Sequence, residues 1–171
     1  IAFNSPGLAT TVSNATAVNN TAIGNGQSGI YAVDATVEVV NATVSGNTDW
    51  AITTENGATV DAADLDIGAS TAADTTLDLV TSDVSLRANA SPAADPSGER
   101  NISRFVEATD SSPAAFLNAT FQYTNGDVAA VDEGRLDVWK HNASGWSELG
   151  TGPATDAAAN EIQYNVTDVG S

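Results

Sequence analysis

The stretch GIYAVDATVEVVNATVSGN, from Gly29 to Asn47, decides the fold class of this chain. Apolar and polar residues alternate along most of it, which is the two-residue period of a β-strand with one buried face. Val and Thr, which favour strands, are frequent in it. The stretch therefore predicts strands that bury a narrow row of small side chains.

The apolar positions of this stretch recur further along the chain, which indicates a repeat. They return at a constant offset of 23 residues, so that Val37, Val39 and Val44 align with Val60, Ala62 and Ile67. Asn41 aligns with Asp64 at the same offset. We therefore expect these apolar residues to form columns in one continuous core.

The repeat also extends in both directions from these two segments. Gly7-Leu8 precedes Gly29-Ile30 by 22 residues, and Val84 and Leu86 follow the Val60 and Ala62 columns at 24. Units of this length with short period-two apolar pairs resemble the rungs of a right-handed parallel β-helix. The resemblance covers residues 1–88 and implies rungs of three short strands, each stacked on the next because one rung alone buries too little surface to fold.

The pattern changes after residue 88. Residues 89–100 are rich in Pro, Ala, Ser and Asp, which predicts a linker or long loop. The segments RFVEAT, VDEGRLDVWKHNASGWSELG and NEIQYNVTDVGS then follow, and residues 137–146 among them predict a hairpin. Residues 101–171 resemble the PGF-pre-PGF type domain of archaeal surface proteins, a resemblance that implies a small β-sandwich used for surface display without catalysis.

The expected fold is therefore all-β. It consists of a short right-handed parallel β-helix with three strands per rung over residues 1–88, and a small antiparallel β-sandwich over residues 101–171. The segment 89–100 joins the two predicted domains.

The charge balance narrows the classes of partner. The 171 residues include 22 acidic and only 5 basic side chains, a net charge of −17, and such a surface repels nucleic acid and anionic membranes. The acidic side chains also repel one another, and concentrated salt screens this self-repulsion. The composition resembles that of proteins from halophilic archaea. No apolar run is long enough to predict a membrane span.

Sequons for N-linked glycosylation are more frequent than chance predicts, because 8 of the 15 Asn residues begin one. The expected sites are Asn14, Asn19, Asn41, Asn118, Asn142 and Asn165, with Asn89 and Asn101 as weaker ones. The alternative explanation is that Asn-Ala-Thr favours turns and is frequent because the chain is rich in Thr. We interpret the excess as the mark of an extracellular, glycosylated cell-surface protein.

Candidate chemistry is sparse, and we expect no catalytic residues and no cofactor. Among enzymes with parallel β-helices, lyases pair calcium-binding acids with an Arg or Lys base, and hydrolases need two carboxylates across the scissile bond. The candidate cluster here is Asp61, Asp64, Asp83 and Arg87. Calcium is the one metal considered, with stacked oxygen ligands as weak candidates: Asp61, Asp64, Asp66 and Asp83. His141 is the only His and Cys is absent, which disfavours zinc.

The three Trp residues offer a different possibility, since Trp50, Trp139 and Trp146 have rings that can stack on sugars. A place in the core is the plainer interpretation of Trp139 and Trp146.

The sequence as a whole favours a non-enzymatic surface protein with a structural, display or adhesion role, in one form a filament subunit. Its expected partners are copies of itself or other surface proteins, with carbohydrate as a further candidate. Two alternatives stay open: a carbohydrate-active β-helix enzyme, a lyase or hydrolase, and a receptor-binding fibre of a virus of halophilic archaea.

Overall fold

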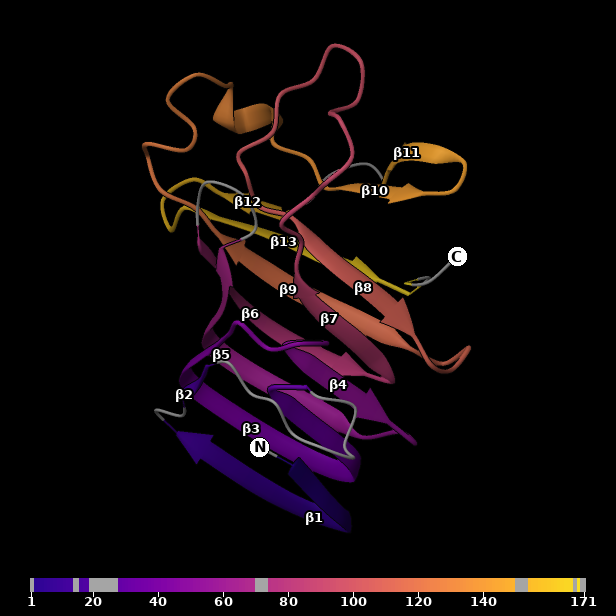
Figure 1. Cartoon of the computed structure of the whole chain (residues 1–171). Helices are drawn as coiled ribbons and strands as arrows, with labels where there is room; N and C mark the ends of the chain where they lie inside the picture. Colours follow the sequence, from indigo (N-terminus) through magenta and orange to yellow (C-terminus); the bar gives the residue numbers. More distant parts are fainter. Residues whose placement is uncertain are drawn as a thin grey trace.

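The computed structural model of the chain describes residues 2–13, 16–18, 28–69, 74–149, 154–167 and 169 (Figure 1). Its regular elements are almost all strands. They are β1 (Ala2–Ser13), β2 (Thr16–Val18), β3 (Ile30–Ser45), β4 (Ile52–Glu55), β5 (Thr59–Ala69), β6 (Asp74–Ser82), β7 (Val84–Ala88), β8 (Val106–Asp110), β9 (Phe116–Gln122), the 3-10 helix η1 (Glu133–Arg135), β10 (Trp139–Asn142), β11 (Gly145–Glu148), β12 (Ala154–Asp156) and β13 (Glu161–Val166).

Eleven of these strands form one curled, open sheet. The order is β12-β13-β9-β6-β5-β3-β4-β7-β8, with β1 and β2 also paired to β3. Strands β1, β2, β4 and β5 all run parallel to β3, whereas the pairs from β5–β6 and β4–β7 onward are antiparallel. The predicted all-β class is confirmed, and its architecture is a sheet of mixed strand direction.

The predicted 23-residue register is confirmed between β3 and β5. Val37 lies opposite Val60 and Val39 opposite Ala62, in adjacent parallel strands. Val37, Val39 and Val60 have no exposed surface, so they form the continuous column that the repeat predicts. Burying each such side chain contributes roughly 1.5–3 kcal/mol relative to leaving it exposed.

Left-handed residues bend the strands while keeping their apolar side chains on one face. Asp34 and Asn41 in β3 have φ of 50°, and Asp64 in β5 has φ of 52°. Asp and Asn tolerate this conformation better than other residues with a side chain. The buried positions are spaced by three rather than two across each bend, from Val39 to Ala42 for example, so the extra residue preserves the inward face.

Outside β3 to β5 the predicted columns are wrong. Upstream, Leu8 lies opposite Ala35, an offset of 27 residues, with an irregularity between Asn4 and Leu8. Downstream, the Val60 column is continued by Thr81, and Leu86 lies beside Ile52. The chain has reversed direction by β6, so an offset that assumes parallel stacking assigns the wrong partners.

The second half of the chain extends the first sheet. β9 pairs with β6 and β8 with β7, so the sheet continues across the segment 89–100. The predicted β-sandwich over residues 101–171 is not a sheet of its own in the described part of the chain. The hairpin predicted at residues 137–146 is confirmed as the separate pair β10–β11.

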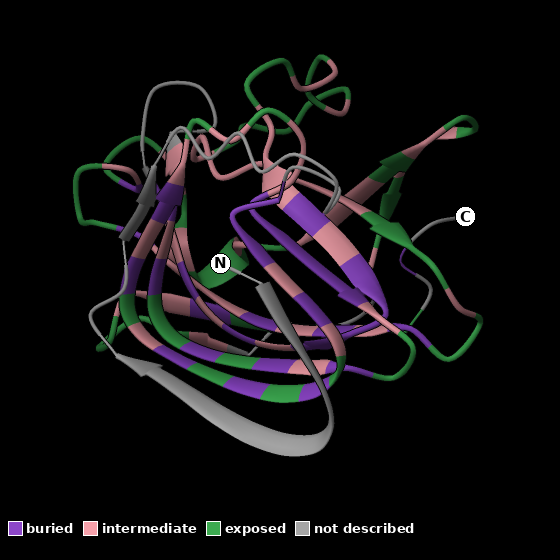
Figure 2. Cartoon of the chain, turned by 60° about the horizontal axis from the view of Figure 1, so that its bottom comes forward, coloured by how far each residue is buried: buried purple, intermediate pink, exposed green. Residues whose placement is uncertain are grey.

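The two faces of the sheet differ sharply in polarity. Figure 2 shows buried and exposed residues alternating along the curled strands. One row that crosses the outer face through laterally paired positions consists of Glu38, Asp61, Val80, Asn118 and Asn165. The inner face carries the apolar core, and its C-terminal part forms the floor of a cavity.

Candidate functional site

A cavity of about 820 Å³ lies over the inner face of β9 and β13. The loop before β8, the segment from residue 130 to 138 and the β10–β11 hairpin supply its other walls. Figure 1 shows these segments crossing above the C-terminal strands. The volume of the cavity falls within the usual range for small-molecule sites, about 300–1,000 Å³.

Strand alternation places the floor residues. Leu117, Ala119 and Phe121 in β9 and Ile162 and Tyr164 in β13 line the cavity, whereas the residues between them face outward. Phe121 and Ile162 are direct cross-strand neighbours. Phe121 and Tyr164 remain partly exposed, unlike the fully buried columns of β3 and β5.

The hairpin places one face of its side chains toward the cavity. Trp139 lies opposite Glu148, and His141 opposite Trp146, so these four side chains share a face. The rings of His141 and Trp146 meet edge to face with 4.9 Å between centroids. Trp146 also donates its indole N–H to the carbonyl oxygen of Ala94 at 2.6 Å, which ties the hairpin to the preceding long loop.

Arg104 fastens the base of that loop to the sheet. Its guanidinium donates to the carbonyl oxygen of Gln122 at 3.0 Å and to the Asp127 carboxylate at 2.8 Å. The side chains are only 9% and 19% exposed, so the pair is shielded from water. Burial on its own would raise the pKa of Asp127, but hydrogen bonds from Thr124 and the Arg104 guanidinium outweigh it and hold that pKa below its usual range.

Replacing Asp127 by Asn should cost about 1.5–3 kcal/mol at neutral pH, because Arg104 loses a charged hydrogen-bond partner while staying buried. The folded-state pKa of Asp127 is lowered, so its contribution is present above its unfolded pKa of about 3.9 and is lost as pH falls through the folded value. The difference in urea stability between the native chain and the variant should therefore shrink in acid. A difference that stays constant from neutral pH to below the folded pKa would contradict this assignment.

A second buried polar contact steadies the segment beyond β9. Tyr123 is 4% exposed and donates its hydroxyl to the Glu133 carboxylate at 2.9 Å. Burial first, and then this hydrogen bond and the Glu133 charge, raise the pKa of Tyr123 to about 12. The phenol thus stays protonated in ordinary buffers and links the start of η1 to the sheet.

The four candidate calcium ligands lie apart from this cavity, and each contributes to local backbone geometry or faces outward. Asp61 is on the outer face of β5, and Asp64 forms a bend whose N–H donates to Asp78 at 2.7 Å. Asp66 and Asp83 accept backbone N–H groups from Gly68 and Gly57 at 2.7 and 2.8 Å. Among the described residues no three Asp, Glu or His side chains gather at a spacing that would hold a metal ion.

Arg87, the basic residue of the candidate catalytic cluster, contacts residues outside that cluster. It forms an ion pair with Glu107 at 2.9 Å and donates to the carbonyl oxygen of Asp49. Its guanidinium carbon lies 4.7 Å from the ring centroid of Trp50, a cation–π contact. Trp50 thus stacks on Arg87, and the structure does not bring Arg87 together with Asp61 and Asp64.

The described sequons fall into two groups. Asn89, Asn101 and Asn142 each accept the backbone N–H of the Ser two residues on, at 2.9, 2.8 and 2.9 Å, which makes a side-chain turn. The others lie within strands and not at a strand end or in a loop, namely Asn41 in β3, Asn118 in β9 and Asn165 in β13. Asn14 and Asn19 lie outside the described residues.

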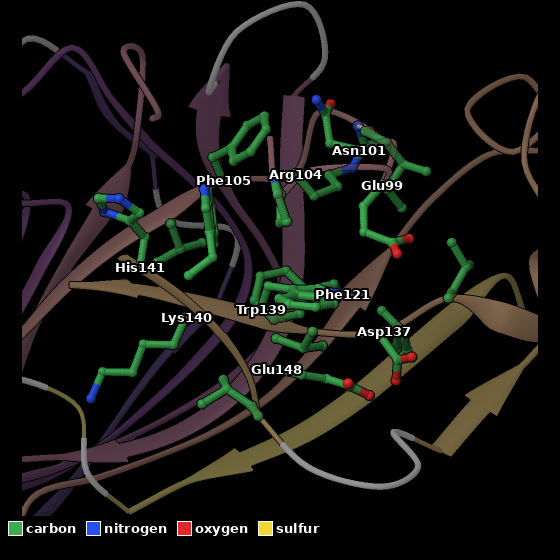
Figure 3. Close-up of a pocket in the computed structure, with 18 of the residues that line it drawn as sticks. Glu99, Asn101, Arg104, Phe105, Phe121, Asp137, Trp139, Lys140, His141 and Glu148 are labelled. Carbon is green, nitrogen blue, oxygen red and sulfur yellow. Dashed lines mark hydrogen bonds between the residues drawn. The ribbon is translucent and has the colours of Figure 1, made fainter. Parts of the chain in front are cut away.

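Sequence reasoning found Trp139 and Trp146 but missed most of the cavity. Figure 3 shows cavity side chains that the sequence does not point to, namely Glu99, Arg104, Phe105, Phe121, Asp137, Lys140 and Glu148. Asn101 also lines the cavity, although the sequence points to it only as a glycosylation site. One signal was available: in a chain with only five basic residues, three Arg and the single Lys occur between residues 100 and 140. Their gathering around one cavity depends on long-range contacts.

No protein-family model, curated protein or solved structure matches this chain. The resemblances to a parallel β-helix and to the PGF-pre-PGF type domain therefore stay predictions. Within the described ranges, no helix is both long and apolar enough to cross a membrane.

Proposed function

We propose that this chain is a glycosylated, non-enzymatic module of an extracellular cell surface, with a structural, display or adhesion role. The observation that carries the proposal is the placement of Asn118 and Asn165. They lie directly opposite each other in β9 and β13, on the outer face of the sheet. Each is followed two residues later by Thr, as N-linked glycosylation requires.

Turn formation does not account for these two sequons. It explains Asn89, Asn101 and Asn142, whose side chains make local turns. Asn118 and Asn165 lie within strands, where Asn is disfavoured by propensity. A pair of outward sequons at such positions is what a surface carrying glycans requires, since a glycan needs solvent around it.

The acidity of the outer face supports a high-salt environment for this surface, such as that of a halophilic archaeon. Glu38 and Asp61 are both exposed and are lateral neighbours in β3 and β5. Like charges in such positions repel each other and destabilise the sheet. Concentrated salt shortens the Debye length to about 3 Å at 1 M and removes most of this repulsion.

The finer fold proposal is that β1 to β5 are rungs of a right-handed parallel β-helix. The parallel pairing of β3 with β1, β4 and β5 supports it. So do the left-handed bends at Asn41 and Asp64, which recur at the rung spacing. On this proposal the antiparallel strands from β6 onward cover the last rung.

Glycopeptide mass spectrometry tests the functional proposal on protein isolated from the cells that make it. We expect peptides containing Asn118 and Asn165 to carry added glycan mass. Asn125 is exposed but begins no sequon, so its peptide serves as the internal control and should be unmodified. Bare Asn at both positions 118 and 165 would overturn the proposal.

A further inference from the structure

We propose that the cavity beneath the β10–β11 hairpin binds a neutral saccharide, with Trp139 as the ring on which the sugar stacks. This gives the adhesion role of the proposed function a ligand, and it rests on that function. Three features support this proposal: the cavity itself, the partial exposure of its aromatic rings, and the excess of acidic over basic side chains around it.

The aromatic rings of the cavity are accessible rather than packed away. Phe105, Phe121 and Trp139 come from three separate segments and all line the cavity, and each is partly exposed. Figure 3 shows the rings of Trp139 and Phe121 in the middle of the view. Sugar rings present flat faces of C–H groups, and burying such a face against an aromatic ring removes apolar surface from water.

Trp139 and Trp146 have different parts in this arrangement. The Trp146 indole N–H is used by the Ala94 carbonyl oxygen, and its ring edge meets His141. The Trp139 indole makes no hydrogen bond to another described residue and lines the cavity with its ring partly exposed. Trp146 therefore holds the wall in place, and Trp139 offers its face and its N–H to a ligand.

Hydrogen-bonding groups of both kinds surround these rings. Glu99, Asp137 and Glu148 line the cavity, and their carboxylates make no hydrogen bond or ion pair with the rest of the described chain. These carboxylates can accept hydrogen bonds from the hydroxyl groups of a sugar. The exposed guanidinium groups of Arg100 and Arg135 can donate hydrogen bonds to the oxygen atoms of the same hydroxyl groups. A few such polar groups around an apolar surface are typical of small-molecule sites.

The charge balance of the lining favours a neutral sugar over an acidic one. Among the described residues of the wall, the acidic side chains are Asp95, Glu99, Glu107, Asp132, Asp137 and Glu148, and the basic ones are Arg100, Arg104, Arg135 and Lys140. Arg104 is already neutralised by Asp127 and Glu107 by Arg87, and Figure 3 shows the Lys140 amino group directed away from the aromatic rings. The acidic side chains that remain still outnumber Arg100 and Arg135. An added carboxylate would thus meet surplus negative charge.

Calorimetric titration of the full chain with maltotriose, mannotriose, galactotriose and trigalacturonate tests the inference. The buffer should hold about 1 M salt or more, to screen the net charge. We expect at least one neutral trisaccharide to bind and to change the Trp fluorescence, and the acidic one to bind more weakly. Trp139→Ala should weaken binding by about tenfold or more, as loss of a central aromatic contact does.

Three further variants separate binding from folding. Glu148→Gln, across the hairpin from Trp139, should weaken binding while keeping the fold, checked by circular dichroism. Trp139→Phe should retain part of the affinity, and Trp50→Phe, outside the cavity, should retain all of it. The inference is overturned if none of the neutral sugars binds, if trigalacturonate binds best, or if Trp139→Ala and Trp50→Phe behave alike. Because the titration needs no glycan on the protein, its failure is independent of the glycopeptide result.

Discussion

Replacing Val60 by Asp should abolish the cooperative fold of the sheet. Val60 has no exposed surface and lies between Val37 in β3 and Thr81 in β6. A carboxylate there would face the buried Val37 and Thr81 side chains of the adjacent strands, and no basic side chain is among the buried residues of the described chain. The expected cost is roughly 3–5 kcal/mol, a large part of the stability of an ordinary domain.

The neighbouring residue provides a matched control. Asp61 is exposed on the opposite face of the same strand, beside Glu38. Asp61→Asn should change stability by no more than about 0.5 kcal/mol, and toward greater stability, since it removes a like-charge pair. Thermal unfolding followed by circular dichroism in concentrated salt measures both variants. Equal melting temperatures for the two would refute the inward placement of Val60.

Gly29→Ala should produce the second large loss. Gly29 is buried immediately before β3, where its N–H donates to the carbonyl oxygen of Trp50 at 3.0 Å. A methyl group there would collide with the Val44 side chain and lie 2.9 Å from the Ala51 carbonyl oxygen. Because backbone and core must both shift, the substitution should cost about 1–3 kcal/mol or more.

Gly126→Ala is the control for this substitution. Its added methyl group would meet only the Thr124 hydroxyl, at an ordinary contact distance of 3.5 Å. It lies in an exposed turn, so we expect a change within about 0.5 kcal/mol. Chemical denaturation of the two variants in the same buffer compares them directly. A Gly29→Ala variant as stable as Gly126→Ala would mean that the backbone at Gly29 approaches Val44 and Ala51 less closely than described.

The part of the fold that could be predicted is the part in which local and repeated signals agree. Period-two alternation marks the strands, and the constant offset of 23 residues identifies Val37 and Val60 as neighbours. Asn41 and Asp64 align at the same offset, and both adopt the left-handed conformation that their side chains tolerate. Each of these properties is carried by residues within one or two repeats.

The candidate site was much harder to predict, because its residues come from segments that share no pattern. Arg104 meets Asp127 and Gln122, and Trp146 meets Ala94, 52 residues earlier in the chain. Nothing in the alternation around Trp139 distinguishes a ring that faces a cavity from one that packs in a core. The sequence favours a core position for both Trp139 and Trp146, whereas the structure gives them different surroundings.

The sequence by itself determined that this chain is all-β, which residues of β3 and β5 face inward, and how acidic the outer face is. Only the tertiary structure decided that the chain runs antiparallel from β6 onward, and that β8, β9 and β13 join the first sheet. The physical reason is that alternation specifies which face of a strand is buried but not the direction of its neighbour. Direction and partner depend on long-range packing, and the cavity exists because those choices place β9 and β13 beneath the β10–β11 hairpin.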